Sequence, residues 1–243
     1  MARETPGMTS HGDERARILE AYRRRAAREK TRDKLFVYED MVHVYRAHER
    51  SIAMLRLLDA CGLRTLADLA ILDVGCGDGN MLRQWLQWGA NPEHLAGIDL
   101  RTDALERART LNPNLDVRLG SAGALPWEDE SFDLVSQLTV FTSILDVTMK
   151  RRVAAEMSRV LRSGGAVLWY DFAYNNPRNP DVRGIGAREI AELFPGFSNR
   201  IQRVTLAPPL ARRIPVPLLP VCYPLASALP FLRTHYLGLL RKR

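Results

Sequence analysis

An apolar run that ends on an acid and leads into three glycines carries the residue types best suited to chemistry. Residues 69–80 read LAILDVGCGDGN, and helical apolar spacing follows them. This order predicts a buried strand, a tight turn and a helix start, the construction that binds nucleotide-like ligands. Gly75, Gly77 and Gly79 allow a sharp turn and let a ligand approach the backbone N–H groups. Asp73 favours a cationic or hydrogen-bond-donating part of that ligand.

The glycine spacing separates two classes of ligand. A dinucleotide turn has the pattern G-x-G-x-x-G, whereas here the third glycine comes one residue early and Asn80 stands at the place of the last one. Asp73 and Asp78 both lie near the turn, and a pyrophosphate prefers a helix N-terminus without acids. The turn therefore favours a ligand with an ammonium group and no phosphate, and disfavours a dehydrogenase.

Five stretches in order resemble the motifs of class I S-adenosylmethionine-dependent methyltransferases. The first is the turn itself, DVGCGDG at 73–79. Residues 97–100 resemble the end of the family's second strand, and 120–122 resemble its third motif. Residues 125–135 resemble the following loop and fourth strand, and 156–165 resemble the helix and turn before the fifth. The resemblance covers about residues 35–175 and is nearest to small-molecule, type 11-like members.

The resemblance implies S-adenosylmethionine as the cofactor and a set of residues that hold it. Asp99 stands where the family has an acid that accepts hydrogen bonds from both ribose hydroxyls, for which a carboxylate is well suited. Ser121 stands at the adenine border, where the family often has aspartate. The cofactor-binding residues are expected to be Asp73, Gly75, Cys76, Gly77, Asp78, Gly79, Asp99, Leu100, Ser121, Ala122 and Gln137.

Alternating strand and helix patterns supply the elements that must position these residues. The alternation predicts an α/β fold with a doubly wound, mostly parallel, Rossmann-like sheet of seven strands. Ligands bind such a sheet outside the carboxyl ends of its strands. Strands are expected at 70–74, 94–99, 116–119, 132–137, 166–172, 199–206 and 235–240, with 163–165 as the turn into the fifth. Helices are expected at 80–88, 102–110, 146–161 and 187–193.

The chain is expected to form one domain of three parts. Residues 1–60 form a helical cap whose helices, 14–34 and 36–58, lie over the carboxyl edge of the first strand. Residues 61–206 form the Rossmann-like core. Residues 207–243 form an apolar, proline-rich cap and a closing strand.

The methyl acceptor is less clearly marked than the cofactor. A hydroxyl acceptor benefits from a nearby base, and the catalytic candidates are Asp171, at the end of the fifth strand, and His43, on the second cap helix. The sequence favours O-methylation of a sugar, lipid-linked or natural-product hydroxyl, with an RNA methyltransferase or a non-catalytic cofactor-binding protein as alternatives. The candidates for substrate binding are Tyr45, Tyr170, Tyr174, Asn175, Asn176 and Arg183.

Basic residues gather at the two ends of the chain. The net charge is +7, and residues 200–243 contain eight Lys/Arg and no acid. Residues 14–34 contain nine Lys/Arg against four acids. These flanks favour an anionic partner, such as a lipid surface or a phosphorylated substrate. Nucleic acid is disfavoured because Tyr22 is the only aromatic residue among the basic residues of 14–34.

Other features bound the location and cofactors. Three cysteines far apart argue against a disulfide framework and fit a reducing compartment. A polar N-terminus predicts no secretory signal and therefore a cytoplasmic protein, with peripheral contact at the inner face of the membrane as an option. No carboxylate follows the fourth strand at 137–142, so no metal is expected. The oligomeric state is left open.

The last part of the chain admits three interpretations. Residues 214–232 carry no charge and are flanked by arginines. That length is enough to cross a membrane, but five prolines interrupt any regular helix. A buried cap over the substrate cleft is favoured, ahead of an interfacial membrane contact and a true span.

Overall fold

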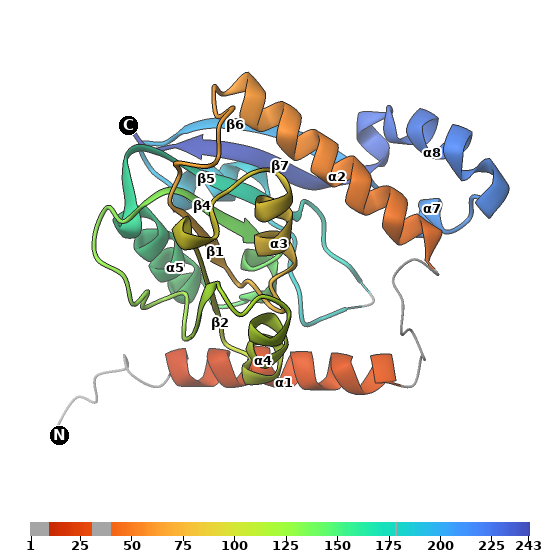
Figure 1. Cartoon of the computed structure of the whole chain (residues 1–243). Coiled ribbons are helices and arrows are strands. Elements are labelled where there is room, and N and C mark those ends of the chain that lie inside the picture. Colours follow the sequence, from red (N-terminus) through yellow and green to blue (C-terminus); the bar gives the residue numbers. More distant parts are fainter. Residues whose placement is uncertain (1–9, 31–39, 178) are drawn as a thin grey trace.

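The computed structural model describes residues 10–30, 40–177 and 179–243, and its centre is a seven-stranded sheet (Figure 1). The strand order is β3-β2-β1-β4-β5-β7-β6. Strands β1 to β5 are parallel, and β7 is antiparallel to both of its neighbours. The predicted doubly wound, mostly parallel sheet is thereby confirmed, and its order reverses between β1 and β4. The strands are β1 (Ile71–Val74), β2 (Leu95–Asp99), β3 (Asp116–Leu119), β4 (Phe132–Leu138), β5 (Leu161–Phe172), β6 (Ser198–Leu206) and β7 (Arg233–Arg241).

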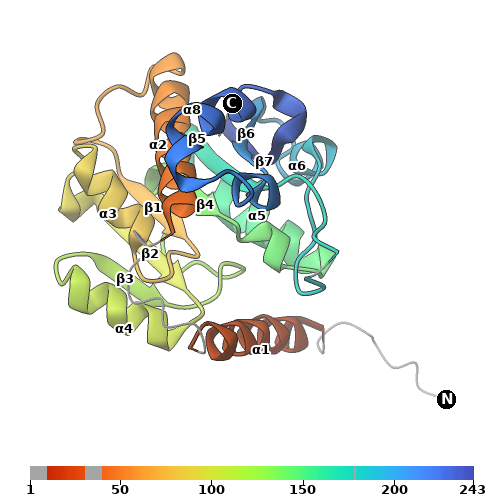
Figure 2. The ribbon, with the colours of Figure 1, turned by 90° about the vertical axis from the view of Figure 1, so that its right-hand side faces the viewer.

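Helices cover both faces of the sheet (Figure 2). One face packs against α2 (Met41–Ala60), α3 (Asn80–Gln87) and α4 (Thr102–Leu111), in an apolar cluster that includes Trp85 and Leu134. The other packs against α5 (Val147–Val160) and α6 (Ala187–Leu193), in a cluster that includes Trp169. Because strand side chains alternate, the buried runs of β4 and β5 supply both clusters.

The two N-terminal helices lie in different places, although both were expected over the carboxyl edge. Helix α1 (Ser10–Lys30) lies at that edge, where its Ile18 lines a cleft together with Gly75 and Asp99. Helix α2 instead lies along β6 and β7. Its Met54, Leu57 and Leu58 are buried at helical spacing, so this stripe must cover the face of the sheet. The predicted ends of these helices at 31–34 and 36–39 lie outside the described residues.

Strand β5 begins earlier than the sequence predicted. The expected turn at 163–165 lies inside the strand, because Leu161 already pairs with Phe132 and the register shifts before the next pair. Gly164 has φ +75°, and a Cβ on Gly165 would lie 2.9 Å from the Asp133 carbonyl oxygen. The two glycines therefore form an irregularity within β5 rather than its start.

Residues 207–232, called the C-terminal segment below, lie beside the start of α2 (Figure 1). The segment contains α7 (Pro208–Ala211), η4 (Val216–Leu218), α8 (Leu219–Ser227) and η5 (Pro230–Leu232). Leu219 and Tyr223 pack on Val42 of α2 and Leu206 of β6. The segment therefore covers α2 and β6, whereas the sequence favoured a cap over the cleft. No helix in the described ranges is long and apolar enough to cross a membrane.

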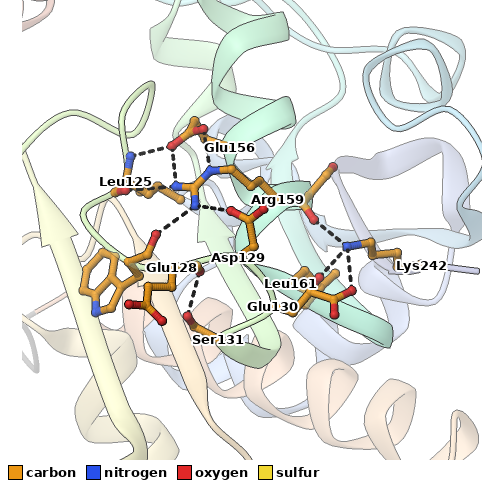
Figure 3. A network of polar contacts seen from close by, with 11 residues as sticks. Leu125, Glu128, Asp129, Glu130, Ser131, Glu156, Arg159, Leu161 and Lys242 are labelled. Carbon is orange, nitrogen blue, oxygen red and sulfur yellow. Dashed lines mark hydrogen bonds and ion pairs between the residues drawn. The ribbon is translucent and has the colours of Figure 1, made fainter.

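Arg159 of α5 fixes the loop between β3 and β4 (Figure 3). Its guanidinium donates to the carbonyl oxygens of Leu125 and Trp127 at 3.0 and 2.9 Å. It also forms ion pairs with Asp129 and Glu156, both at 2.8 Å. The Glu156 carboxylate in turn accepts from the Leu125 N–H at 2.8 Å. This network holds the chain that follows the predicted adenine border.

Candidate active site

The glycine turn is fixed between β2 and the loop after β4. Gly75 and Cys76 donate their backbone N–H groups to the Ile98 carbonyl oxygen at 2.8 and 3.0 Å. Gly75 has φ +72°, and a Cβ built there would lie 2.5 Å from Cγ2 of Val140. Only glycine accommodates both this left-handed backbone and this close approach. The turn is therefore held in one place at the carboxyl edge of the sheet.

Asp99 ends β2 and faces the turn. Its Oδ2 accepts from the Gly77 N–H at 2.9 Å, and its Oδ1 accepts from the Arg101 N–H at 2.8 Å. Burial raises the pKa of Asp99, while these two backbone hydrogen bonds oppose the rise. Each carboxylate oxygen has two lone pairs, so each keeps a further acceptor site. Asp99 is therefore able to accept hydrogen bonds from both hydroxyls of a diol.

Asp73 lies in β1, opposite Ser136 of β4. The Ser136 hydroxyl donates to Oδ1 of Asp73 at 2.7 Å. Burial raises the pKa of Asp73 to about 7, and the negative charge of Asp99 adds to the rise; the Ser136 hydrogen bond and the Arg50 guanidinium oppose it. A cation beside Asp73 would restore its ionisation. This strand end therefore suits a ligand with an ammonium group.

A cleft with about 610 Å³ of empty space lies beside the turn. Gly75 and Asp99 form part of its wall, and most of the remaining wall is apolar. The apolar lining consists of Ile18, Ile98, Leu100, Ala122, Leu138, Val140, Ile144 and Met149. A mostly apolar cleft with a few placed polar groups is the common form of a small-molecule site. In this cleft the carboxylate of Asp99 is the acidic group that a ligand would meet.

Helix α1 closes this cleft from outside. Its Ile18 and Tyr22 line the cleft. Glu14 accepts from the N–H groups of Leu145 and Asp146 at 2.6 and 3.3 Å. Burial opposes ionisation of Glu14, but hydrogen bonds from the Arg17 side chain and these backbone groups outweigh it and hold its pKa below the usual value. The charged carboxylate therefore ties α1 to the chain after β4.

Further contacts fix the position of α1 along the cleft. Arg17 donates to the carbonyl oxygen of Ser143 at 2.5 Å, and Arg24 forms an ion pair with Asp181 at 2.8 Å. The Arg101 guanidinium lies 5.1 Å from the centre of the Tyr22 ring. The sequence placed no cofactor contact on α1. The signal for one was the helical spacing of Ile18 and Tyr22 within an otherwise charged stretch.

Two of the predicted cofactor residues turn away from the cleft. The Cys76 side chain packs on β2, where its Sγ would lie 2.9 Å from a Cβ on Gly97. Asp78 faces Arg83 and Arg107 at 3.8 and 4.0 Å. Both residues therefore belong to the turn without pointing into the cleft. The direction of the Asp78 side chain does not support the prediction that it contacts a ligand ammonium.

Ser121 and Gln137 hold the loops around the cleft. The Ser121 hydroxyl accepts from the Gly123 N–H at 3.3 Å. Oε1 of Gln137 accepts from the Val140 N–H at 3.1 Å. Nε2 of Gln137 is buried and has no hydrogen-bond partner within the described ranges. An orphaned buried donor at a strand end is consistent with a ligand that supplies the missing acceptor.

Asp171 is fully buried and satisfied by neighbouring groups. It accepts from the hydroxyl and N–H of Thr142 at 2.5 and 3.2 Å, and from the Phe172 N–H at 3.0 Å. Burial raises its pKa to about 6, against these hydrogen bonds. The carboxylate faces the loop after β4 and does not line the cleft. It is therefore placed to position that loop rather than to act on a substrate.

The other predicted acceptor-side residues are spread over the molecule. His43 is exposed at the first turn of α2. The Tyr45 ring lies 5.5 Å from that of Tyr223 in α8, and the exposed Tyr174 lies under the guanidinium of Arg203. In the loop after β5, the Asn175 side chain accepts from the Gly184 N–H, Asn176 accepts from the Asn179 N–H through its carbonyl oxygen, and Arg183 pairs with Glu189. None of the six predicted substrate residues lines the cleft at Asp99.

Tyr170 lies beside a group of polar and charged side chains that was not predicted from the sequence. Its hydroxyl shares a hydrogen bond of 2.9 Å with the Thr205 hydroxyl, and its ring stacks on His235 at 4.8 Å. The Arg50 guanidinium lies 5.5 Å from the centre of the Tyr170 ring. Burial lowers the pKa of His235 to about 3, and the charges of Arg46 and Arg50 lower it further. Both arginines of α2 therefore face this end of the sheet.

Arg46 and Arg50 are short of partners. Nε of each is buried without a hydrogen bond, and neither guanidinium lies within ion-pair distance of an acid in the part of the chain that the structure describes, although Arg50 is near enough to Asp73 to lower its pKa. Between them, Glu49 is engaged by the N–H of Thr205 at 3.1 Å and the hydroxyl of Tyr223 at 2.7 Å. The signal for this group was three charged residues, Arg46, Glu49 and Arg50, within one stretch of a predicted helix with helical apolar spacing. All three are partly buried, although arginine and glutamate are mostly exposed in folded proteins.

Residues 71–165 match the family model for a methyltransferase domain. A ubiquinone/menaquinone biosynthesis C-methyltransferase from Campylobacter jejuni is 31% identical over 109 residues, which are 43% of this chain and 45% of that protein. A phthiotriol/phenolphthiotriol dimycocerosates methyltransferase from Mycobacterium tuberculosis is 33% identical over 144 residues, 55% of this chain and 52% of that protein. The chain thus spans about half the length of these curated relatives.

Solved structures share the fold over a greater length. An S-adenosylmethionine-dependent methyltransferase from Thermotoga maritima, a possible histamine N-methyltransferase, has a TM-score of 0.60 at 18% identity, and covers 90% of this chain and 97% of that one. The YcgJ protein from Bacillus subtilis has a TM-score of 0.58 at 18% identity, covering 81% and 99%.

The strand order, the glycine turn and the matched domain define an S-adenosylmethionine-binding Rossmann-like protein. Residues 71–165 are similar to a methyltransferase domain, and together the comparisons support a class I S-adenosylmethionine-dependent methyltransferase. The cofactor of that family is S-adenosylmethionine, and the residues present agree with it in chemistry, since the cleft wall contains the carboxylate of Asp99 and Asp73 is buried nearby at the end of β1. No group of three or more His, Cys, Asp or Glu side chains able to hold a metal ion lies within the described ranges.

Proposed function

We propose that this protein methylates a hydroxyl of a small lipid-linked or natural-product molecule. The observation that carries the proposal is the juxtaposition of two sites at one strand edge. Asp99 lines the cleft, Asp73 is buried one strand away, and the Arg50 guanidinium acts on Asp73 and lies over the ring of Tyr170. The two relatives named above are a quinone-biosynthesis methyltransferase and a dimycocerosate methyltransferase, and these names favour a lipophilic acceptor.

The residues of the chain take separate roles in this proposal. S-adenosylmethionine, when bound, supplies a methyl group on a sulfonium, so that transfer breaks a sulfur–carbon bond and forms an oxygen–carbon bond. Asp99 holds the ribose hydroxyls and Asp73 receives the ammonium. Helix α1 excludes water from the cleft through Glu14 and Arg17. These residues orient the cofactor, and none of them needs to act on the acceptor.

Arg46 and Arg50 act on the acceptor side. An acceptor hydroxyl must lose its proton, which passes to solvent water as the oxygen–carbon bond forms, and a positive charge nearby favours the anionic form. Two guanidinium groups that form no ion pair with an acid among the described residues provide such a field, and they stabilise the negative charge that develops on the acceptor oxygen. His235, with its lowered pKa, is neutral at physiological pH and adds no competing positive charge. In this proposal Asp171 holds the loop at Thr142 in place. His43 lies at the surface and takes no part in catalysis.

Transfer of C-methyl groups is a second candidate, because the relative from Campylobacter jejuni is named as a C-methyltransferase. The same arginine field would stabilise an enolate or phenolate whose carbon is the nucleophile. The nature of the product distinguishes the two, since the new methyl group is bonded to oxygen in one case and to carbon in the other.

The test is to incubate the protein with methyl-labelled S-adenosylmethionine and separate lipid, water-soluble and RNA fractions of a cell extract. We expect label in the lipid fraction, and NMR of the product shows whether a methyl ether has formed. Label confined to RNA would overturn the proposal in favour of a nucleic-acid methyltransferase. Cofactor binding without any labelled product would favour a non-catalytic protein.

A matched pair of variants tests the acceptor role. Arg46→Gln should lower turnover about tenfold while the cofactor Kd stays within twofold, because only Arg50 lies close enough to affect Asp73. Arg56→Gln, an exposed arginine on the same helix, is the control and should leave turnover unchanged. Equal turnover of the two variants would remove the arginines from the mechanism.

A further inference from the structure

The C-terminal segment exposes apolar side chains on its outer side. Half of the large apolar side chains that are exposed in the described ranges belong to these 26 residues. The most exposed are Phe231, at 70%, and Leu225, at 67%. Apolar surface gathered in this way on a folded protein marks an interaction site. The outer apolar face is defined here as Val216, Leu218, Val221, Leu225, Leu229 and Phe231.

Helix α8 separates this face from a buried one. Leu219, Tyr223 and Ser227, four residues apart, are buried against α2 and β6. Val221 and Leu225, also four residues apart, point outward and are exposed. One side of α8 therefore packs on the protein, and the opposite, exposed side is apolar as well. A surface helix normally has polar residues on its exposed side. Its outer side needs an apolar partner.

The charge around the face decides the kind of partner. Residues 200–243 contain no acid, and the exposed Arg212 and Arg213 border the face without an ion-pair partner among the described residues. Apolar side chains rimmed by arginines match the boundary of a bilayer, where acyl chains lie below anionic headgroups. We propose that the outer apolar face docks on an anionic lipid bilayer.

The prolines and the neighbouring contacts fit docking rather than insertion. Pro215, Pro220 and Pro230 divide the segment into short turns that lie along the surface, and none of these is a spanning helix. Tyr223 on the buried side donates to Glu49, which lies between Arg46 and Arg50 on α2. Docking would therefore bring the proposed acceptor end of the protein to the lipid surface. The inference itself concerns binding and does not rest on the proposed function.

Vesicle flotation with the full chain tests the proposal. We expect the protein to float with vesicles made of equal parts phosphatidylcholine and phosphatidylglycerol, and to stay in solution with phosphatidylcholine alone. The double variant Leu225→Gln with Phe231→Gln should reduce the bound fraction about tenfold, because it removes the two most exposed apolar groups. The double variant Arg212→Gln with Arg213→Gln should weaken binding to the anionic vesicles and reduce its dependence on salt.

The control is Leu111→Gln, at the end of α4, which is 56% exposed and lies outside the segment. It should bind vesicles as the unchanged protein does. Failure of the unchanged protein to float with either vesicle would overturn the proposal. So would an equal loss of binding in the control, or a dimer in analytical ultracentrifugation that the Leu225 and Phe231 variant abolishes while no vesicle binding is seen. Methyl transfer to a water-soluble acceptor would leave this result unaffected.

Discussion

Helix α1 and the C-terminal segment both lie outside the sheet, but they contact the rest of the molecule in opposite ways. Helix α1 is attached by charged groups, with Glu14, Arg17 and Arg24 bonded to the loops around the cleft. The C-terminal segment is attached mainly by apolar packing on Val42 and Leu206, with Tyr223 and Ser227 bonded to Glu49, and it exposes apolar side chains on its other side. The first arrangement is the one proposed to seal the cofactor cleft. The second is the one proposed to dock on a lipid bilayer.

This difference has a consequence for substitutions. Changes at the cleft and α1 should alter cofactor affinity and leave vesicle binding as it is. Changes at the outer apolar face should do the reverse. Cofactor affinity and vesicle binding are therefore measured for every variant. A single variant that changes both would show that the two regions are not independent.

The largest effect is expected for Asp99→Ala. The substitution removes the acceptor of two ribose hydrogen bonds, and hydrogen bonds to a charged group contribute about 1.5 to 3 kcal/mol each. The cofactor Kd should rise about a hundredfold, measured by isothermal titration calorimetry. Asp99→Asn keeps the shape of the side chain and one acceptor oxygen, so its cofactor Kd should lie between those of the unchanged protein and Asp99→Ala. Vesicle flotation should not change.

An unchanged cofactor Kd in Asp99→Ala would refute the ribose role. Since Asp99 also accepts from Gly77 and Arg101, the thermal midpoint of each variant is measured alongside. A variant that has lost the glycine turn would unfold at a lower temperature even without cofactor. The Asn variant, which keeps an acceptor for the turn, separates that loss from loss of the ribose contact.

The cofactor side of the fold was accessible from the sequence because local rules place it. Apolar runs that end on acids mark the strand ends at Asp73 and Asp99, and the positive φ of Gly75 requires glycine. The predicted bounds of β3 and α6 agree with the structure, as each is limited by a change of periodicity. These features depend on neighbours close in sequence or on parallel strands in a known order.

The acceptor side was not accessible, because distant segments decide it. Asp171 stands at a strand end, as expected, but Thr142 from another loop satisfies it. Arg46 and Arg50 face Tyr170 because α2 packs on the face of the sheet at β6 and β7, and not at the carboxyl edge of β1. No periodicity in residues 40–60 specifies which face of the sheet a helix covers. The pairing of segments far apart in sequence is thus where pattern-based inference ends.

A smaller effect is expected for the pH dependence of stability through Asp73. Its pKa is about 7 in the folded chain and 3.8 as the ordinary value, so the folded state binds the proton more strongly. Its contribution is fully favourable below pH 3.8 and is lost as the pH rises through 7. In Asp73→Asn that loss is absent. Relative to the unchanged protein, the cofactor-free variant should gain about 3 kcal/mol of unfolding free energy between pH 4.5 and 8, measured by urea denaturation.

Asp171→Asn provides the comparison for this pH effect, because burial raises that pKa only to about 6. Its gain should be smaller and complete at a lower pH. With the cofactor present, Asp73 should gain a cationic partner and the pH effect of Asp73 should shrink. A parallel pH dependence of Asp73→Asn and the unchanged protein would contradict a protonated Asp73.

The smallest effect is expected for Glu14→Gln in α1. The neutral side chain loses the ion pair with Arg17 at 2.7 Å and weakens the bonds from Leu145 and Asp146. Loss of about 1 kcal/mol of closure should raise the cofactor Kd about fivefold, measured by the same calorimetry. Glu20→Gln on the same helix is the control, because Glu20 forms only long, exposed pairs of 3.8 and 3.9 Å with Arg23 and Arg24. Exposed pairs contribute little, so Glu20→Gln should bind cofactor normally. If both variants bind the cofactor with equal Kd, α1 does not seal the cleft through Glu14. The contrast between α1 and the C-terminal segment would then be wrong for α1.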